Sequence, residues 1–163
     1  MNTLVAPYSE SLIQRVTRLW LLGCDLANKL APLGDLALRL WVANEFFKSG
    51  LTKIQSWETT LQLFQYEYQV PLLPPALAAV MGTATELGMP VFIALGLAGR
   101  MSAGVLFVFN IIAVISYPAL EPAGLAMHYA WGVVLFALCV RGPGRLSIDH
   151  TIRRAFAHST GAR

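Results

Sequence analysis

Acidic, basic and imidazole side chains interrupt the most apolar stretches of this sequence at very few positions. Glu86 is the single such residue in the stretch 72–99, and His128 is the single one in the stretch 122–140. Asn110 lies midway along the apolar stretch between these two. A carboxyl group, an imidazole and an amide in apolar surroundings can move protons, bind a polar headgroup or hydrogen-bond neighbouring helices.

A second group of ionisable residues lies in the stretch 31–51. Asp35 and Arg39 are four residues apart, and Glu45 and Lys48 are three apart. Both spacings place the two charges on one face of a helix, where they can neutralise each other. Arg39 suits a role in folding or in binding an anionic or quinonoid headgroup, whereas the pairing of Glu45 with Lys48 favours a structural role.

Each candidate site residue also has a structural interpretation. An ionisable group in the middle of a membrane span costs about 2.5–3.5 kcal/mol, so Glu86 needs either a function or a hydrogen-bonded partner on a neighbouring helix. His128 is the one histidine in an apolar stretch, so bis-histidine haem ligation within one chain is excluded and no metal site is predicted. We expect His128 to make an interfacial hydrogen bond or to contact a ligand, and Asn110 to bridge two helices.

The composition indicates an integral membrane protein. Of the 163 residues, 13% are charged and 56% are hydrophobic, whereas a soluble domain carries about 25% charged residues. A spanning helix needs about 20 mostly apolar residues. Spans are therefore predicted at about 31–51, 74–98, 101–119 and 123–141, the first being the weakest by hydropathy. Because the connections between the last three are short, the predicted fold is an all-α bundle of four transmembrane helices, 31–141.

The distribution of basic residues predicts the orientation. With four spans, nine of the 12 Lys and Arg residues fall on one side, Lys48 and Lys53 on the other, and Arg39 within the membrane. Positive residues concentrate on the cytosolic side, so both termini are predicted to be cytoplasmic. Arg100 then lies in a structural turn at that side. No basic cluster is interleaved with aromatic residues, so nucleic acid is not an expected partner.

The segments flanking the bundle are predicted to lie at the membrane surface. In residues 1–30, apolar positions recur at helical spacing from Leu12 to Leu30, which predicts an amphipathic interfacial helix. Aromatic residues alternate with polar ones in 57–68, which suits the outer headgroup layer. Residues 142–163 form a basic cytosolic tail. Cys24 and Cys139 match no metal or redox spacing, and their role stays open.

Several motifs together resemble those of a known family. Residues 36–40 (LALRL) and 46–53 (FFKSGLTK) resemble the opening "LLLRL … FxxxGxxKL" of DoxX-type membrane proteins. Glu86-Leu87-Gly88 resembles the family's mid-span "ExxG", with one residue fewer between the glutamate and the glycine. Residues 95–100 are similar to its "LGLxTR" turn, with Gly99 where threonine is usual. The last match comprises His128 and residues 142–149, which resemble the closing histidine and "GPGxxSLD" tail.

The resemblance covers about residues 33–150 and implies a bacterial inner-membrane protein with four helices. Family members are linked to membrane redox systems, including a subunit of thiosulfate:quinone oxidoreductase and complexes that handle oxidative or thiol stress. Residues 64–75 also resemble a subgroup that accompanies the biosynthesis of modified, copper-binding secreted peptides. Because Gly99 replaces the usual threonine of the family's turn, this chain lacks the hydroxyl group there, but Arg100 matches the arginine of the motif.

Two functions follow as alternatives. In the first, the chain is a membrane redox subunit that binds a quinone within the bundle, and Arg39, Glu45, Glu86 and His128 contact its headgroup or move its protons. The sequence has no haem, flavin or iron–sulfur signature, so a partner protein would supply electrons. In the second, the chain is a non-enzymatic scaffold, small permease or assembly factor. A protein partner or a homo-oligomer is expected in both, and catalysis by the chain itself is left open.

Overall fold

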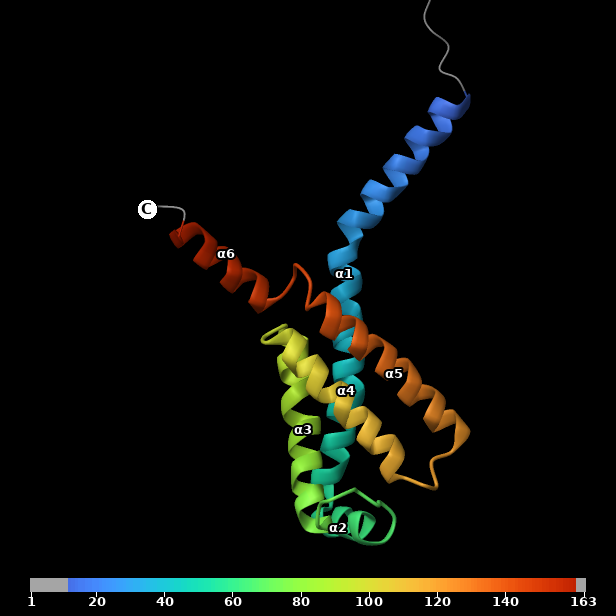
Figure 1. Cartoon of the computed structure of the whole chain (residues 1–163), viewed down its shortest axis with the longest axis vertical. Coiled ribbons are helices and arrows are strands. Elements are labelled where there is room, and N and C mark those ends of the chain that lie inside the picture. Colours follow the sequence, from blue (N-terminus) through green and yellow to red (C-terminus); the bar gives the residue numbers. More distant parts are fainter. Residues whose placement is uncertain (1–11, 161–163) are drawn as a thin grey trace, which may run out of the picture. The chain divides into compact units, whose positions relative to one another are not determined.

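The computed structural model describes residues 12–160, and their regular structure is entirely α-helical, as predicted. Figure 1 shows the six helices in chain order. They are α1 (Leu12–Gln55), α2 (Trp57–Tyr66), α3 (Pro75–Leu95), α4 (Gly99–Ser116), α5 (Pro122–Arg141) and α6 (Ile148–Thr160). The chain divides into two compact units between Pro32 and Leu33.

The first unit consists, in its described part, of residues 12–32 of α1. The predicted interfacial helix and the first predicted span are joined in this single helix, because Pro32 lies inside it without ending it. Most side chains of the unit are exposed, including Leu12 at 79% and Trp20 at 72%. A surface with so many exposed apolar side chains needs a covering, which agrees with the prediction of membrane contact.

The second unit contains three helices that are long and apolar enough to cross a membrane, namely α3, α4 and α5. They coincide with the last three predicted spans, with ends shifted by a few residues. Gly96 ends α3 in a left-handed conformation (φ 65°), and the Leu97 amide donates to the Phe92 carbonyl at 2.9 Å. This hydrogen bond completes a Schellman-type cap, so the link to α4 is very short.

The remaining predicted span corresponds to residues 33–55 of α1. This segment carries too many charges to qualify as a span by composition, but one face of it is buried in the second unit. The buried positions recur at helical spacing; they are Arg39, Val42, Ala43, Phe46 and Gly50. Phe46 packs against Phe109 of α4 and Trp131 of α5, with ring centroids 6.3 and 5.6 Å away. The segment therefore belongs to the helical bundle.

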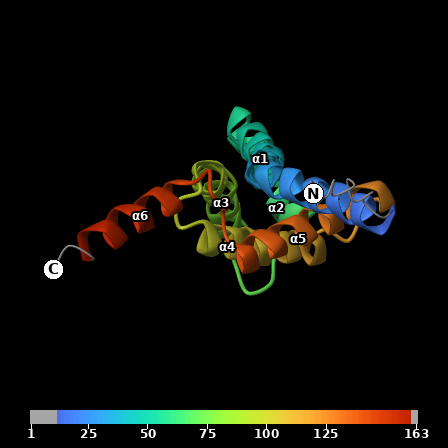
Figure 2. The same ribbon diagram turned by 90° about the horizontal axis from the view of Figure 1, so that it is seen from above.

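Two segments that the sequence indicated only by composition are helices. The predicted aromatic interfacial segment, 57–68, begins with α2, whose Phe64 packs on Ala78 and Ala79 of α3. The predicted basic tail, 142–163, contains α6. Figures 1 and 2 both show α6 leading outward from the ends of α3 and α5.

Candidate functional site

A cavity of about 350 Å³ lies within the second unit, bounded by α2–α5, residues 33–55 of α1 and the loop after α2. Its walls are mainly apolar. The polar residues among those that line it are Ser49, Lys53, Tyr68, Thr85, Glu86, Ser116, Tyr117 and His128. A small, mostly apolar cavity with a few polar groups is the usual form of a small-molecule site.

A buried ion pair forms one wall of the cavity. The Lys53 Nζ lies 2.7 Å from Glu86 Oε2 and 2.9 Å from Glu86 Oε1, and the two side chains are 15% and 7% exposed. Ser49 Oγ donates to Glu86 Oε1 at 3.1 Å and accepts from Lys53 Nζ at 3.0 Å. Glu86 was predicted as a candidate, whereas Lys53 was assigned to an outer loop. Lys53 reaches Glu86 because α1 continues to Gln55, which places it one turn after Ser49 on the same face.

Gly50 brings this part of α1 close to α3. A Cβ atom at this position would lie 2.9 Å from the Leu87 side chain and 3.1 Å from Glu86 Cβ. Glycine is therefore required for the two helices to approach closely enough for the short side chain of Ser49 to reach Glu86. The Ser49-Gly50-Leu51-Thr52-Lys53 segment combines this close approach with two hydrogen-bonding partners for the carboxylate.

His128 and Asn110 form a second polar group. The Asn110 amide nitrogen donates to the His128 carbonyl at 3.0 Å, and the Asn110 amide oxygen lies 2.8 Å from His128 Nδ1. Since this oxygen can only accept, Nδ1 carries the proton and Nε2 of the neutral ring is left as an acceptor. Asn110 thus bridges α4 and α5, as predicted, and holds His128, which lines the cavity, in a defined orientation.

The wall formed by the loop after α2 is rich in aromatic rings. Tyr68 packs edge-on against Phe64 and Tyr117, with centroids 5.0 and 5.2 Å away. Burial, reinforced by Tyr117 and Glu86, raises the pKa of Tyr68, so its phenol stays protonated. Within the described residues, the buried Ser116 Oγ, also in this lining, has no hydrogen-bond partner. A ligand in the cavity could bond to it, which the sequence alone did not suggest.

Arg39 lies in a different place from the other candidates. It is 1% exposed, and its Nη1 donates to the carbonyls of Ile93 and Ala94 at 3.3 and 3.2 Å, while Nη2 donates to the Leu146 carbonyl. The last carbonyls of a helix have no partners within it and attract a positive charge. Asp35 acts on Arg39 as a nearby opposite charge, as predicted, while the guanidinium itself ends on these carbonyls. Asp35 Oδ1 lies 3.7 Å from Arg141 Nη2.

Further contacts surround the α3–α4 turn. The Asp149 carboxylate accepts from the amides of Ala98 and Gly99, both at 2.8 Å, and the Asp149 amide donates to the Gly96 carbonyl at 3.0 Å. We call these four residues and Arg39 the turn cluster. A Cβ at Gly99 would lie 2.6 Å from Pro143, so this chain has no room there for the usual threonine.

Arg100, the predicted anchor of this turn, donates from Nη2 to the Arg141 carbonyl at 3.4 Å and thereby joins α4 to the end of α5. Glu45 and Lys48 form the predicted pair, with Glu45 Oε1 3.5 Å from Lys48 Nζ. Neither residue lines the cavity, and Lys48 is 63% exposed. The structure therefore brings together Glu86, His128 and Asn110, and separates them from Arg39, Glu45 and Lys48.

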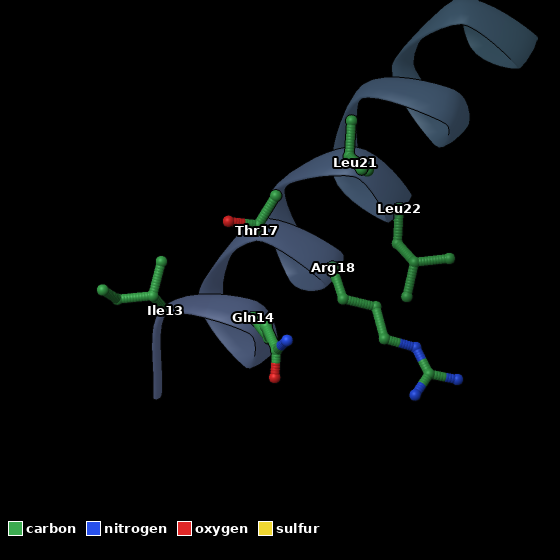
Figure 3. A pocket seen from close by; sticks show the side chains of 6 residues that line it. All are labelled: Ile13, Gln14, Thr17, Arg18, Leu21 and Leu22. Carbon is green, nitrogen blue, oxygen red and sulfur yellow. The ribbon is translucent and has the colours of Figure 1, made fainter. Parts of the chain in front are cut away.

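A second hollow lies on the first unit. All six residues that line it belong to residues 13–22 of α1, as Figure 3 shows, so it is the surface of one helix. Cys24 of the first unit and Cys139 of the second are free thiols. Across residues 12–160, no group of three or more His, Cys, Asp and Glu side chains is placed to hold a metal ion.

Comparison with known proteins identifies related sequences. The family model described as DoxX matches residues 34–119, which include Lys53, Glu86 and Asn110. A protein of Haemophilus influenzae, described as an uncharacterized protein, is 29% identical over 140 residues, which cover 82% of this chain and 92% of that protein. No solved structure matches the chain significantly.

Proposed function

Since this chain belongs to the DoxX family, we propose that it is the membrane subunit of a redox system and binds the headgroup of a quinone in the cavity beside Glu86. It is a multi-pass membrane protein with α3, α4 and α5 as spans. The proposal adds residues 33–55 of α1 as the fourth span. It places the protein in the bacterial inner membrane with both termini in the cytosol, because most Lys and Arg residues then lie on the cytosolic side.

The observation that carries the proposal is the Lys53–Glu86 ion pair in the wall of an apolar cavity. Removing two charges from water costs several kcal/mol per ion, and a well-packed apolar pair would be as stable or more stable. A buried pair that borders a cavity can serve a ligand as well as the fold. Lys53 can donate a hydrogen bond to a carbonyl oxygen, and Glu86 can exchange a proton with it.

The other polar groups suit the same ligand class. Reduction of a quinone to its quinol adds two electrons and two protons. The Glu86 carboxylate and the acceptor Nε2 of His128 would each take up one proton before passing it to a ring oxygen, and Asn110 positions His128 through two hydrogen bonds. The apolar walls match the ring and its tail. The electrons would come from a partner protein, since the sequence carries no recognisable redox cofactor motif.

The test is to measure bound quinone after gentle purification. The full chain is reconstituted in lipid nanodiscs, and extracted quinone is quantified per folded protein by mass spectrometry. Glu86→Gln is expected to lower quinone occupancy at least about ten-fold, the effect of losing one hydrogen bond to a charged group. The matched control is Glu45→Gln, since Glu45 lies outside the cavity. Equal occupancy in both variants, or no quinone in the wild-type protein, would contradict the proposal.

The exposed first unit favours a second candidate, a non-enzymatic scaffold or assembly factor. Leu12, Leu19 and Trp20 expose large apolar surfaces at 79%, 69% and 72%, and such surfaces often contact a protein or a membrane. This candidate predicts that Leu19→Glu and Trp20→Glu lower the amount of a partner complex recovered from cells. It also predicts unchanged redox activity per assembled complex in the Glu86→Gln variant.

A further inference from the structure

Helix α6 begins beside the turn that joins the end of α3 to the start of α4. The Asp149 carboxylate accepts from the amides of Ala98, just before α4, and of Gly99, its first residue, and the Asp149 amide donates to the Gly96 carbonyl, which follows the last turn of α3. The three-residue link between these antiparallel spans, 96–98, must lie at a face of the bilayer, because each span must end there. These hydrogen bonds therefore hold the first turn of α6 at the membrane surface.

The sequence of α6 gives it one apolar face. Ile148, Ile152 and Phe156 follow one another at intervals of four residues and are 38%, 40% and 68% exposed. Residues at this spacing line one face of a helix. Ala155 lies beside this stripe and is also exposed. The face is thus apolar, accessible from outside the bundle, and located where the bilayer surface must be.

The charged side chains of α6 that face solvent are positive. Arg153 flanks the apolar stripe, Arg154 lies on the opposite face, and both are exposed. The single acidic residue of the helix, Asp149, is occupied by the two amides of α4. Three exposed arginines, Arg100, Arg141 and Arg145, lie in the segments on which α6 is anchored. An apolar stripe with a basic polar face is the composition of helices that lie in an anionic membrane surface.

From this combination we infer that α6 lies along the bilayer in which its own bundle sits, with Ile148, Ile152 and Phe156 inserted among the acyl chains and the arginines on anionic lipid headgroups. Its partner is the anionic lipid surface. Asp149 holds the first turn of α6 in place, so docking requires only that the rest of the helix turns toward the bilayer surface. The inference needs only α3 and α4 as membrane spans and is independent of the quinone proposal.

The test uses the full chain in lipid nanodiscs. Ala155→Cys is labelled with a polarity-sensitive fluorophore in a Cys24→Ser, Cys139→Ala background. Emission is compared between phosphatidylcholine alone and an equal mixture with phosphatidylglycerol. We expect blue-shifted emission in the anionic nanodiscs. Each arginine near an anionic surface should contribute about five-fold to the ratio of docked to undocked α6, and raised salt should weaken docking.

Matched variants separate charge from folding. Arg153→Glu with Arg154→Glu should lower the docked ratio at least about 25-fold, whereas Arg153→Lys with Arg154→Lys should keep it. Size-exclusion profiles identify variants that fail to fold, for which the single substitutions are compared instead. Water-like emission in both lipid mixtures would overturn the inference. So would equal emission in the glutamate and lysine variants, or blue-shifted emission that is independent of lipid charge, as expected if α6 packs on another protein.

Discussion

Arg39 and Glu86 are both buried charged residues of the second unit, with 1% and 5% of the whole residue exposed, but their surroundings differ. Arg39 ends on three backbone carbonyls and belongs to the turn cluster. Glu86 ends on the side chains of Lys53 and Ser49 and borders a cavity. Backbone carbonyls cannot change their charge or be replaced by mutation, whereas Lys53 can change its protonation and both partners of Glu86 line the cavity, where they can contact a ligand.

This difference indicates which buried charge serves the fold and which can serve chemistry. The turn cluster joins α1, the end of α3 and the segment before α6, and its hydrogen bonds cap helix ends. The ion pair at Glu86 joins α1 to α3 as well, but it does so beside open space. The two regions should therefore differ in one respect. A substitution in either should lower stability, but only at the ion pair should a second substitution restore it.

The largest effect is expected from Arg39→Leu. It removes the donors to the carbonyls of Ala94 and Leu146, whereas the Ile93 carbonyl keeps the Gly96 amide as its donor. Each unsatisfied buried acceptor costs about 1–3 kcal/mol, so we expect a loss of about 2–6 kcal/mol in the free energy of unfolding. Thermal unfolding in mild detergent measures it. Arg39→Lys should lose less, because the charge remains. A melting temperature of Arg39→Leu equal to that of the wild type would refute the structural role.

A nearly equal loss, about 3–5 kcal/mol, is expected from Lys53→Met, which leaves the buried Glu86 carboxylate without its cation. Here a second substitution should rescue the fold. The double variant Lys53→Met, Glu86→Gln carries no buried charge at this position and should recover most of the stability. A full double-mutant cycle by thermal unfolding provides the measurement. Additive losses in the double variant would show that the two side chains do not depend on each other.

A smaller effect is expected at Gly50. The added Cβ of Gly50→Ala would meet Leu87 at 2.9 Å and force α1 away from α3, which costs about 1–3 kcal/mol. Gly88→Ala is the matched control on α3, because nothing lies within 4 Å of its Cβ position. That control should be neutral or stabilising by up to about 1 kcal/mol. Equal melting temperatures for the two variants would argue against close approach at Gly50.

The smallest effect concerns the ionisation of Tyr68. Its pKa is raised above that of a free tyrosine, about 10, so stability from this residue is present below pH 10 and is lost as the pH rises through the folded-state pKa. Tyrosinate absorbance should therefore reach its plateau at a lower pH in Tyr68→Phe than in the wild type, with one tyrosine fewer. Identical titration curves after scaling for tyrosine number would contradict the burial of this phenol.

The sequence allowed much of the fold to be predicted, for reasons that differ between segments. α3, α4 and α5 were predicted because about 20 apolar residues in a row have one interpretation in a membrane protein. The burial of Arg39 was indicated by its place in an apolar stretch. Its partners could not be predicted, because backbone carbonyls carry no residue-specific signal. Asp35, the obvious partner by spacing, forms its ion pair with Arg141 at the end of α5, which is distant in the sequence.

Part of the site could also be predicted from the apolar stretches. Glu86, Asn110 and His128 stand out because they are rare in apolar stretches. Lys53 and Ser49 stand out only as members of the family-like segment 46–53, because Lys53 follows the predicted span. A helical extension by one turn places Lys53 in a cavity wall. The lysine of that motif and the Ser49–Lys53 spacing of four residues were the available signals.

The most direct test of the central claim, that the cavity beside Glu86 is a ligand site and the turn cluster is not, is quinone occupancy in two variants of known stability. The double variant Lys53→Met, Glu86→Gln and the single variant Arg39→Lys are each reconstituted in nanodiscs with the same quinone. Bound quinone per folded protein is measured by mass spectrometry. We predict that the double variant is folded and loses quinone at least about ten-fold. Arg39→Lys should be less stable but keep wild-type occupancy per folded protein. Wild-type occupancy in the double variant would contradict the account.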